Sequence, residues 1–194
     1  MALQLRKGSA RRAHLLKDAG VYTDSANAVH LLGFSGEQVP ISPTAGTWLE
    51  LIGSRAQKFS LQAQFGRSIN DNMQLVTRAT SLRVGGVTIV VRLALSTASQ
   101  QWEVTAAANG KVINGSSATL AGGITVRVAK FNPPSHQVSS RVTINAGFVK
   151  LVTTQRFDSK AGKPNDNFNF VLTLVGPLKP PVSGTLSTSY NAVF

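Results

Sequence analysis

The chain has 194 residues, a length typical of one domain, and its 20 basic and 8 acidic residues give a formal net charge of +12. Cysteine is absent, which excludes disulfides, thiolate metal sites and a cysteine nucleophile. No apolar run approaches the ~20 residues of a membrane helix, and no secretory signal follows the basic start. We therefore expect an intracellular protein without a membrane partner, although an arginine-bearing start that lacks acids is also typical of an organelle transit peptide.

Basic residues are concentrated at the start, where residues 6–17 read RKGSARRAHLLK and contain no acid. Residues 9–19 are predicted to form one short helix, which is too short to be stable alone in water. We therefore expect a basic, partly disordered arm over residues 1–27. Without an aromatic residue to stack on bases, this arm is either a solvated tail without function or a segment that neutralises phosphates without reading sequence. The nucleic-acid-binding residues predicted here are Arg6, Lys7, Arg11, Arg12 and Lys17.

After the arm the hydrophobic pattern has a period of two, which is typical of half-buried strands. It is clearest in three stretches, GITVRVAKF (123–131), RVTINAGF (141–148) and FNFVLTLV (168–175). Further strands are predicted at 47–52, 57–65, 82–95, 101–108 and 182–190, and less clearly at 29–34. Turn residues such as NGSS, NPPS and KAGKPNDN separate these runs. The spacing predicts an all-β sandwich or jelly roll over residues 28–178.

The last segment, residues 179–194, is predicted to be a C-terminal extension. Pro180 and Pro181 break the preceding strand, yet the end of the chain is apolar. The extension either folds back on its own domain or clamps a neighbouring copy. The low charge of the body favours extensive contact between copies, because the centres of subunit interfaces are depleted in charge. We predict that Tyr190, Val193 and Phe194 lie at a subunit interface.

Catalysis is poorly supported by the sequence. The histidines His14, His30 and His136 are far apart in the chain, and none belongs to a known catalytic motif. We interpret His30 as a structural or interface residue. The two NDN triplets, at 70–72 and 165–167, contain one carboxylate each and are interpreted as Asx turns rather than Ca²⁺ loops. We therefore predict a protein that is not an enzyme and has no metal or cofactor.

The combination of a basic arm, a β-rich body and an apolar tail resembles the coat proteins of small icosahedral plant RNA viruses, the bromoviruses in particular. The stretch LRVGGVTIVVRLALS (82–96) is similar to an early core strand of those proteins, which follows a comparable basic opening. The stretch FVLTLVGPLKPPVSGTLSTSYNAVF (170–194) is similar in layout to their last strand and tail.

The resemblance implies a single eight-stranded jelly-roll β-sandwich with a flexible basic N-terminal arm. It also implies a viral coat protein that assembles from many copies into an icosahedral shell and packages single-stranded RNA through the arm. Such a protein is located in the virion, and in the host cytoplasm during assembly. Two alternatives remain open, namely a non-catalytic β-rich nucleic-acid-binding protein and a phage coat protein of a different β fold.

Overall fold

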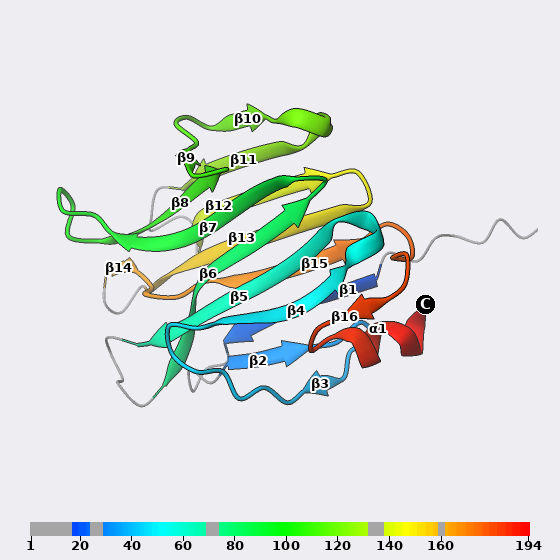
Figure 1. Ribbon diagram of the computed structural model, residues 1–194. Coiled ribbons are helices and arrows are strands. Elements are labelled where there is room, and N and C mark those ends of the chain that lie inside the picture. Colours follow the sequence, from blue (N-terminus) through cyan, green and yellow to red (C-terminus); the bar gives the residue numbers. More distant parts are fainter. Residues whose placement is uncertain (1–16, 24–28, 69–73, 132–137, 159–161) are drawn as a thin grey trace, which may run out of the picture.

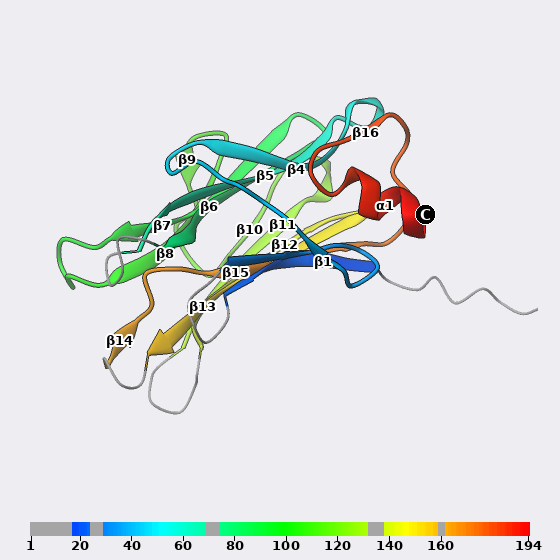
Figure 2. The same cartoon turned by 90° about the horizontal axis from the view of Figure 1, so that it is seen from below.

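The computed structural model describes residues 17–23, 29–68, 74–131, 138–158 and 162–194. Within these ranges the protein consists of antiparallel strands, two short 3-10 turns (Arg55–Gln57 and Ala121–Gly123) and one helix. The strands form two sheets that pack face to face (Figures 1 and 2). The expectation of an all-β sandwich is therefore confirmed.

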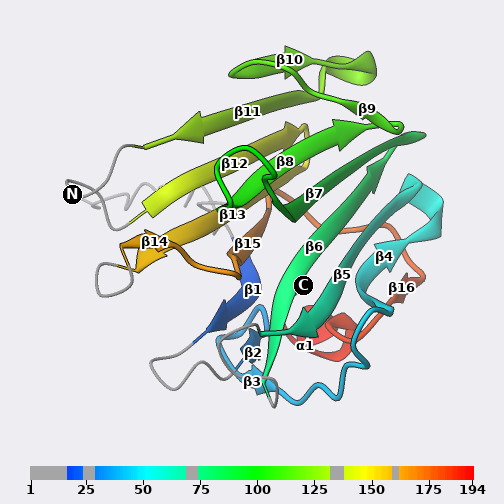
Figure 3. The ribbon, with the colours of Figure 1, turned by 90° about the vertical axis from the view of Figure 1, so that its left-hand side faces the viewer.

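The larger sheet has nine strands, and most of them are neighbours in the chain as well as in space (Figure 3). In spatial order it contains β10 (Ser117–Thr119), β11 (Thr125–Lys130), β12 (Val138–Ala146), β13 (Val149–Asp158), β15 (Asn169–Leu174), β1 (Lys17–Thr23), β2 (Val29–Leu32) and β3 (Gln38–Val39), with β14 (Lys163–Pro164) paired to β13.

The smaller sheet has seven strands and is also built from consecutive neighbours. Its spatial order is β16 (Val182–Ser183), β4 (Trp48–Ser54), β5 (Phe59–Arg67), β6 (Leu75–Val84), β7 (Val87–Leu95), β8 (Trp102–Ala108) and β9 (Lys111–Val112). The strands at the outer edges of both sheets are only two or three residues long.

The strand count and connectivity expected of an eight-stranded jelly roll are not confirmed. A jelly roll contains two Greek keys, in which a strand returns by a long connection to lie beside the first strand of a group. Here β4 to β9 follow one another in a single sheet, and β10 to β13 do the same in the other. Each sheet therefore contains one run of consecutive strands, while β1 to β3 join the larger sheet beside β15 and β16 joins the smaller sheet beside β4.

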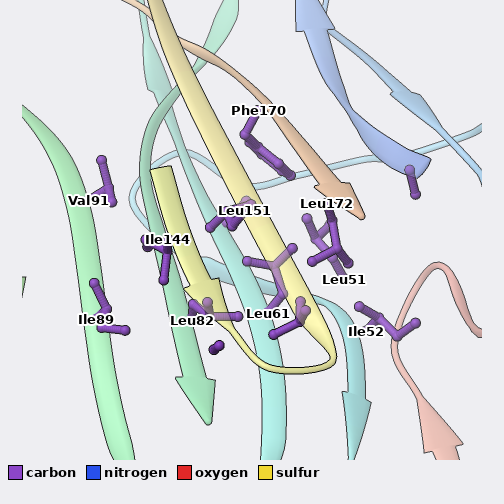
Figure 4. Packing of buried hydrophobic residues seen from close by; sticks show 14 of the residues in the cluster. Leu51, Ile52, Leu61, Leu82, Ile89, Val91, Ile144, Leu151, Phe170 and Leu172 are labelled. Atoms are coloured by element: carbon purple, nitrogen blue, oxygen red, sulfur yellow. The ribbon is translucent and has the colours of Figure 1, made fainter. Parts of the chain in front are cut away.

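The core lies between the two sheets and is made of aliphatic and aromatic side chains from nearly every long strand (Figure 4). Leu61 and Leu82 from the smaller sheet, and Ile144, Leu151 and Leu172 from the larger one, are fully buried. Alternate residues of each strand face this layer, as the period of two requires. The intervening residues therefore form the outer faces of the sandwich.

The predicted arm is too long, because residues 17–23 form β1 in the interior of the larger sheet. β1 pairs with β15 on one side and β2 on the other, and Ala19 and Val21 are buried in the core. The boundary predicted at residue 27 and the C-terminal part of the helix predicted at 9–19 are therefore wrong. The preceding part of the arm lies outside the described residues.

Several other strand predictions need correction. The single strand predicted at 82–95 is the end of β6 and all of β7, joined by a turn at Gly85 and Gly86. Both glycines have positive φ angles, 58° and 94°, which suit a tight hairpin turn. The first part of β6 and all of β13 were not predicted as strands.

The C-terminal extension folds back onto its own domain. Of the predicted strand 182–190, only β16 is a strand, and the chain continues as the helix α1 (Ser187–Val193) at one end of the sandwich (Figure 2). Tyr190 is 4% exposed, and its hydroxyl accepts a hydrogen bond from the Leu178 N–H at 2.5 Å. Its ring stacks on Phe194, which is 43% exposed, while Val193 is half-buried. Among the described residues, no helix is long and apolar enough to cross a membrane.

A serine–glutamate contact holds α1 to the larger sheet. Ser189 accepts a hydrogen bond from the Phe34 N–H at 2.6 Å and also hydrogen-bonds Glu37. The pKa of the Glu37 carboxyl is lowered, first by the Ser189 hydrogen bond and then by that of Ser35. This contact therefore stabilises the fold above the ordinary pKa of glutamate, and the stabilisation is lost as the pH falls through the lowered value.

We expect Glu37→Gln to remove this pH-dependent contribution. Between neutral pH and about pH 3, below the ordinary pKa of glutamate, the variant should lose less of its free energy of unfolding than the wild type. The difference should stay below about 1 kcal/mol, because the carboxylate is exposed to solvent. Urea titrations at the two pH values measure it. An identical loss in both proteins would show that Glu37 does not contribute.

Candidate nucleic-acid interface

The residues predicted to bind nucleic acid are mostly outside the described part of the chain. Arg6, Lys7, Arg11 and Arg12 all precede residue 17. Lys17 is the first residue of β1, opposite Leu174 of β15, and its side chain is not among those described. The arm therefore stays a prediction.

The outer face of the larger sheet carries a second group of cations, here called the basic face. It consists of four exposed side chains, Arg127 on β11, Arg141 on β12, and Lys150 and Arg156 on β13. Each occupies a position that alternates with buried core residues, such as Val126, Val142 and Leu151. The four cations therefore project from three adjacent strands on the same side of the sheet.

Among the described residues, none of these cations lies within ion-pair distance of a carboxylate. The guanidinium of Arg141 lies 5.9 Å from the centre of the Phe131 ring. The ring has no net charge, so this contact does not neutralise the positive charge of Arg141. Two acids share the outer face, and one of them, Asp158, lies two residues from Arg156 on the same strand. Asp18 is on β1, two strands from Lys150, and Asp158 is opposite Lys163 at the end of β13.

Hydrogen-bonding side chains fill the space between the cations. Thr143 lies directly opposite Arg127, Thr154 opposite Arg141, and Asn145 opposite Lys150. Hydroxyl and amide groups donate to phosphate oxygens and to ribose, and lysine and arginine neutralise phosphates. A flat face with this composition fits a polyanion that is bound by its backbone.

The outer face of the smaller sheet has a different character, and we call it the neutral face. Its central row runs across four strands through Gln62, Ser81, Val90 and Ala107. Glu50 on β4 lies opposite Gln62 and extends this row, and the flanking rows contain Arg83, Arg92 and Glu103. Opposite charges are equal in number here, whereas cations outnumber acids on the basic face.

The second NDN triplet, which was interpreted as an Asx turn, holds a buried ion pair. Arg78 contacts the Asp166 carboxylate at 3.2 Å, with side-chain exposures of 15% and 8%, and Ser68 donates to the same carboxylate oxygen at 3.1 Å. Burial lowers the pKa of Arg78, and the charge of Asp166 opposes that shift. The guanidinium also lies 4.5 Å from the centre of the Trp102 ring. Asp166 is therefore engaged in a structural contact. The first triplet, 70–72, lies outside the described residues.

A cleft of about 450 Å³ opens beside this pair, and its lining includes Trp102, Phe131 and Phe157. Lys130 and Glu103 form a salt bridge at 3.2 Å across its rim. The pKa of Glu103 is lowered, first by the Ser99 hydroxyl and then by Lys130. Gln155, which also lines the cleft, accepts a hydrogen bond from Ser140 and donates to the carbonyl oxygens of Trp102 and Asn165, so its amide N–H groups are already used within the protein.

His30, which was interpreted as a structural or interface residue, stacks on the ring of Tyr22. The two residues are opposite each other on β2 and β1, and their ring centres are 4.9 Å apart with an angle of 19° between the planes. Gln38 contacts the Nδ1 atom of His30 from the adjacent strand. The stacked pair lies on the same side of the sheet as the basic face.

No model of a known protein family matches the sequence, and no curated protein matches it.

Sequence reasoning missed the basic face, although part of its signal is visible in the sequence. In the strand predicted at 123–131, Arg127 alternates with Ile124, Val126 and Val128, so its outward direction follows from the predicted strand. The sequence does not show that β11 pairs with β12 and β12 with β13, and this pairing brings the separate cations onto one surface.

Proposed function

We propose that this protein is a viral coat protein that assembles from many copies into a closed shell and packages single-stranded RNA. The basic face contacts the RNA, and the N-terminal arm adds further phosphate contacts through Arg6, Lys7, Arg11, Arg12 and Lys17. The assembling protein is found in the host cytoplasm and then in the virion. It acts without catalysis, metal or cofactor.

The observation that supports this proposal most directly is the contrast between the two outer faces. A shell wall needs one side that attracts the genome and other surfaces through which copies can pack without electrostatic repulsion. The basic face meets the first requirement, since its four cations have no carboxylate partner among the described residues. The neutral face meets the second, because its charges balance and its four central positions, Gln62, Ser81, Val90 and Ala107, are uncharged.

The strand order favours one form of the proposal over another. A jelly roll of bromovirus type is the form implied by the sequence resemblance. The runs of consecutive strands, β4 to β9 in one sheet and β10 to β13 in the other, fit better with a coat protein of a different β fold, which was among the alternatives. We therefore propose the shell function without jelly-roll connectivity.

A second candidate, a β-rich nucleic-acid-binding protein that forms no shell, is favoured by the same basic face. The two candidates differ in oligomeric state. We expect the full chain, expressed and purified with RNA, to form uniform particles that size-exclusion chromatography and electron microscopy detect. A monomer or dimer that binds RNA under all salt conditions would support the second candidate and contradict the shell.

A charge placed on the neutral face tests its role in assembly. We expect Ser81→Lys to reduce particle formation strongly, because copies that meet through this face would bury a lysine at the centre of the contact. RNA binding by the unassembled subunit should remain. The matched control is Thr143→Lys, which adds the same charge at the centre of the basic face and should leave assembly intact. Equal particle yields from both variants, measured by size exclusion, would contradict a role for the neutral face.

A further inference from the structure

The stacked pair of Tyr22 and His30 lies at the border of the basic face, where the surface is apolar. Tyr22 is 36% exposed, although one side of its ring is occupied by His30. The chain contains two tyrosines, and the other one, Tyr190, is buried. Tyr22 therefore offers an accessible, positioned aromatic ring next to a group of cations.

Beside Tyr22 the outer face of the larger sheet carries a row of three small or apolar residues, Gly20, Val171 and Val152, which we call the floor. Gly20 is the next outward position on β1, and a Cβ there would lie 2.3 Å from the Phe170 carbonyl oxygen, so the strand spacing requires glycine. Val171 lies opposite Gly20 and is 43% exposed, because no side chain covers it. Val152 follows on the next strand. The floor is therefore apolar, with the Tyr22 ring at its edge.

The floor connects the aromatic ring to the cations. The same row of the sheet continues from Val152 through Thr143 to Arg127. With a strand spacing of about 4.8 Å, Arg127 and Gly20 are about 19 Å apart along this row. A short length of single strand spans that distance, with its phosphates near the cations and a base at Tyr22.

We propose that Tyr22, supported by His30, is a stacking platform for a nucleobase and makes the basic face selective for single-stranded nucleic acid. Positive charge that follows the backbone, combined with an exposed aromatic ring, is the usual arrangement in proteins that bind single strands. In a duplex each base is already stacked and paired, so it is not available to the ring. This inference rests on the proposed function, because it assumes that the basic face binds nucleic acid.

The test compares the full-length wild type with Tyr22→Leu and Tyr22→Phe. Each protein is titrated, at fixed low salt, with a fluorescent oligouridylate and with a duplex of the same length. We expect Tyr22→Leu to weaken single-strand binding by about 5- to 150-fold, the range for loss of one stacked base, and to leave duplex binding unchanged. Tyr22→Phe retains the ring and should bind as the wild type does.

The outcomes separate the inference from the proposed function. If the wild type binds neither nucleic acid, the proposed function fails. If the wild type binds but Tyr22→Leu is unchanged, or loses single-strand and duplex binding equally, only the stacking platform is overturned.

A second measurement covers the case in which thermal unfolding shows that Tyr22→Leu is misfolded. Wild-type protein is photocrosslinked to 5-bromouridine-substituted RNA and digested with trypsin. The platform predicts a crosslink in the peptide Asp18–Arg55, at Tyr22 or His30. Crosslinks confined to other peptides would overturn it.

Discussion

Changing Arg127, Arg141, Lys150 and Arg156 together to glutamine is expected to weaken the binding of single-stranded RNA by about 30- to 1,000-fold. This range follows from about 0.5–1 kcal/mol for each exposed ionic contact. The slope of log affinity against log salt should become shallower by about 2.8, since each phosphate contact on a single strand contributes about 0.7. Fluorescence anisotropy at several salt concentrations measures both quantities. The fold should be preserved, because all four side chains are exposed.

The matched control changes four exposed cations of the smaller sheet and its adjoining turn to glutamine. The positions are Arg55, Arg83, Arg92 and Lys111. Either set lowers the formal net charge from +12 to +8, because four positive charges are removed from the same chain. An equal loss of affinity and slope in both variants would mean that total charge, rather than the basic face, attracts RNA.

The second large effect concerns the C-terminal helix. We expect Tyr190→Ala to lower the free energy of unfolding by about 3–5 kcal/mol, because it empties a buried aromatic site at the end of the core. Tyr190 contacts Phe34 and Phe194 through its ring, and its hydroxyl bonds the backbone of Leu178. Removing the ring therefore loosens the contact of α1 with Phe34, which follows β2, and with the segment at Leu178.

Urea denaturation followed by circular dichroism measures this loss, and Tyr190→Phe is the matched control. The control keeps the ring and removes the hydroxyl, so it should cost only about 1–2 kcal/mol for the unpaired Leu178 N–H. If Tyr190→Ala abolished particles but left the stability of the subunit unchanged, the C-terminal segment would act as a clamp between copies. That outcome would contradict the fold-back contact.

The prediction of a subunit-interface role must be divided among the three terminal residues. Tyr190 is buried within its own subunit and does not offer a surface to a neighbour in this conformation. Phe194 is 43% exposed and remains available for contact. The sequence showed an apolar end that needed burial, but it could not show which surface would provide it.

The all-β fold was predictable because many strands have one fully apolar face. Phe168, Phe170, Leu172 and Leu174 are all buried, as their alternation predicted. β13 was missed because its inward positions continue from Val149 and Leu151 to the polar Thr153 and Gln155. Polar residues in the core hide the period of two on which the prediction depends.

β6 was missed in part for a different reason. The pairing of β5 with β6 shifts register next to Gln64, so that Thr77 faces the core and Arg78 interrupts the alternation. Such a bulge adds one residue and reverses the direction of the side chains that follow. The helix α1 was predicted as a strand because its sequence, STSYNAV, has little helical propensity of its own. Packing of Tyr190 supplies the stability instead.

The short strands at the edges of both sheets affect how the protein associates with itself at high concentration. β3, β9 and β16 have two residues each and β10 has three, so they offer few unpaired backbone groups to another chain. Long open margins promote fibril growth, because an incoming strand adds to them by hydrogen bonding. In the proposed shell function, these short margins would protect copies at high local concentration from runaway polymerisation, so that the copies meet through side chains rather than through main-chain ladders.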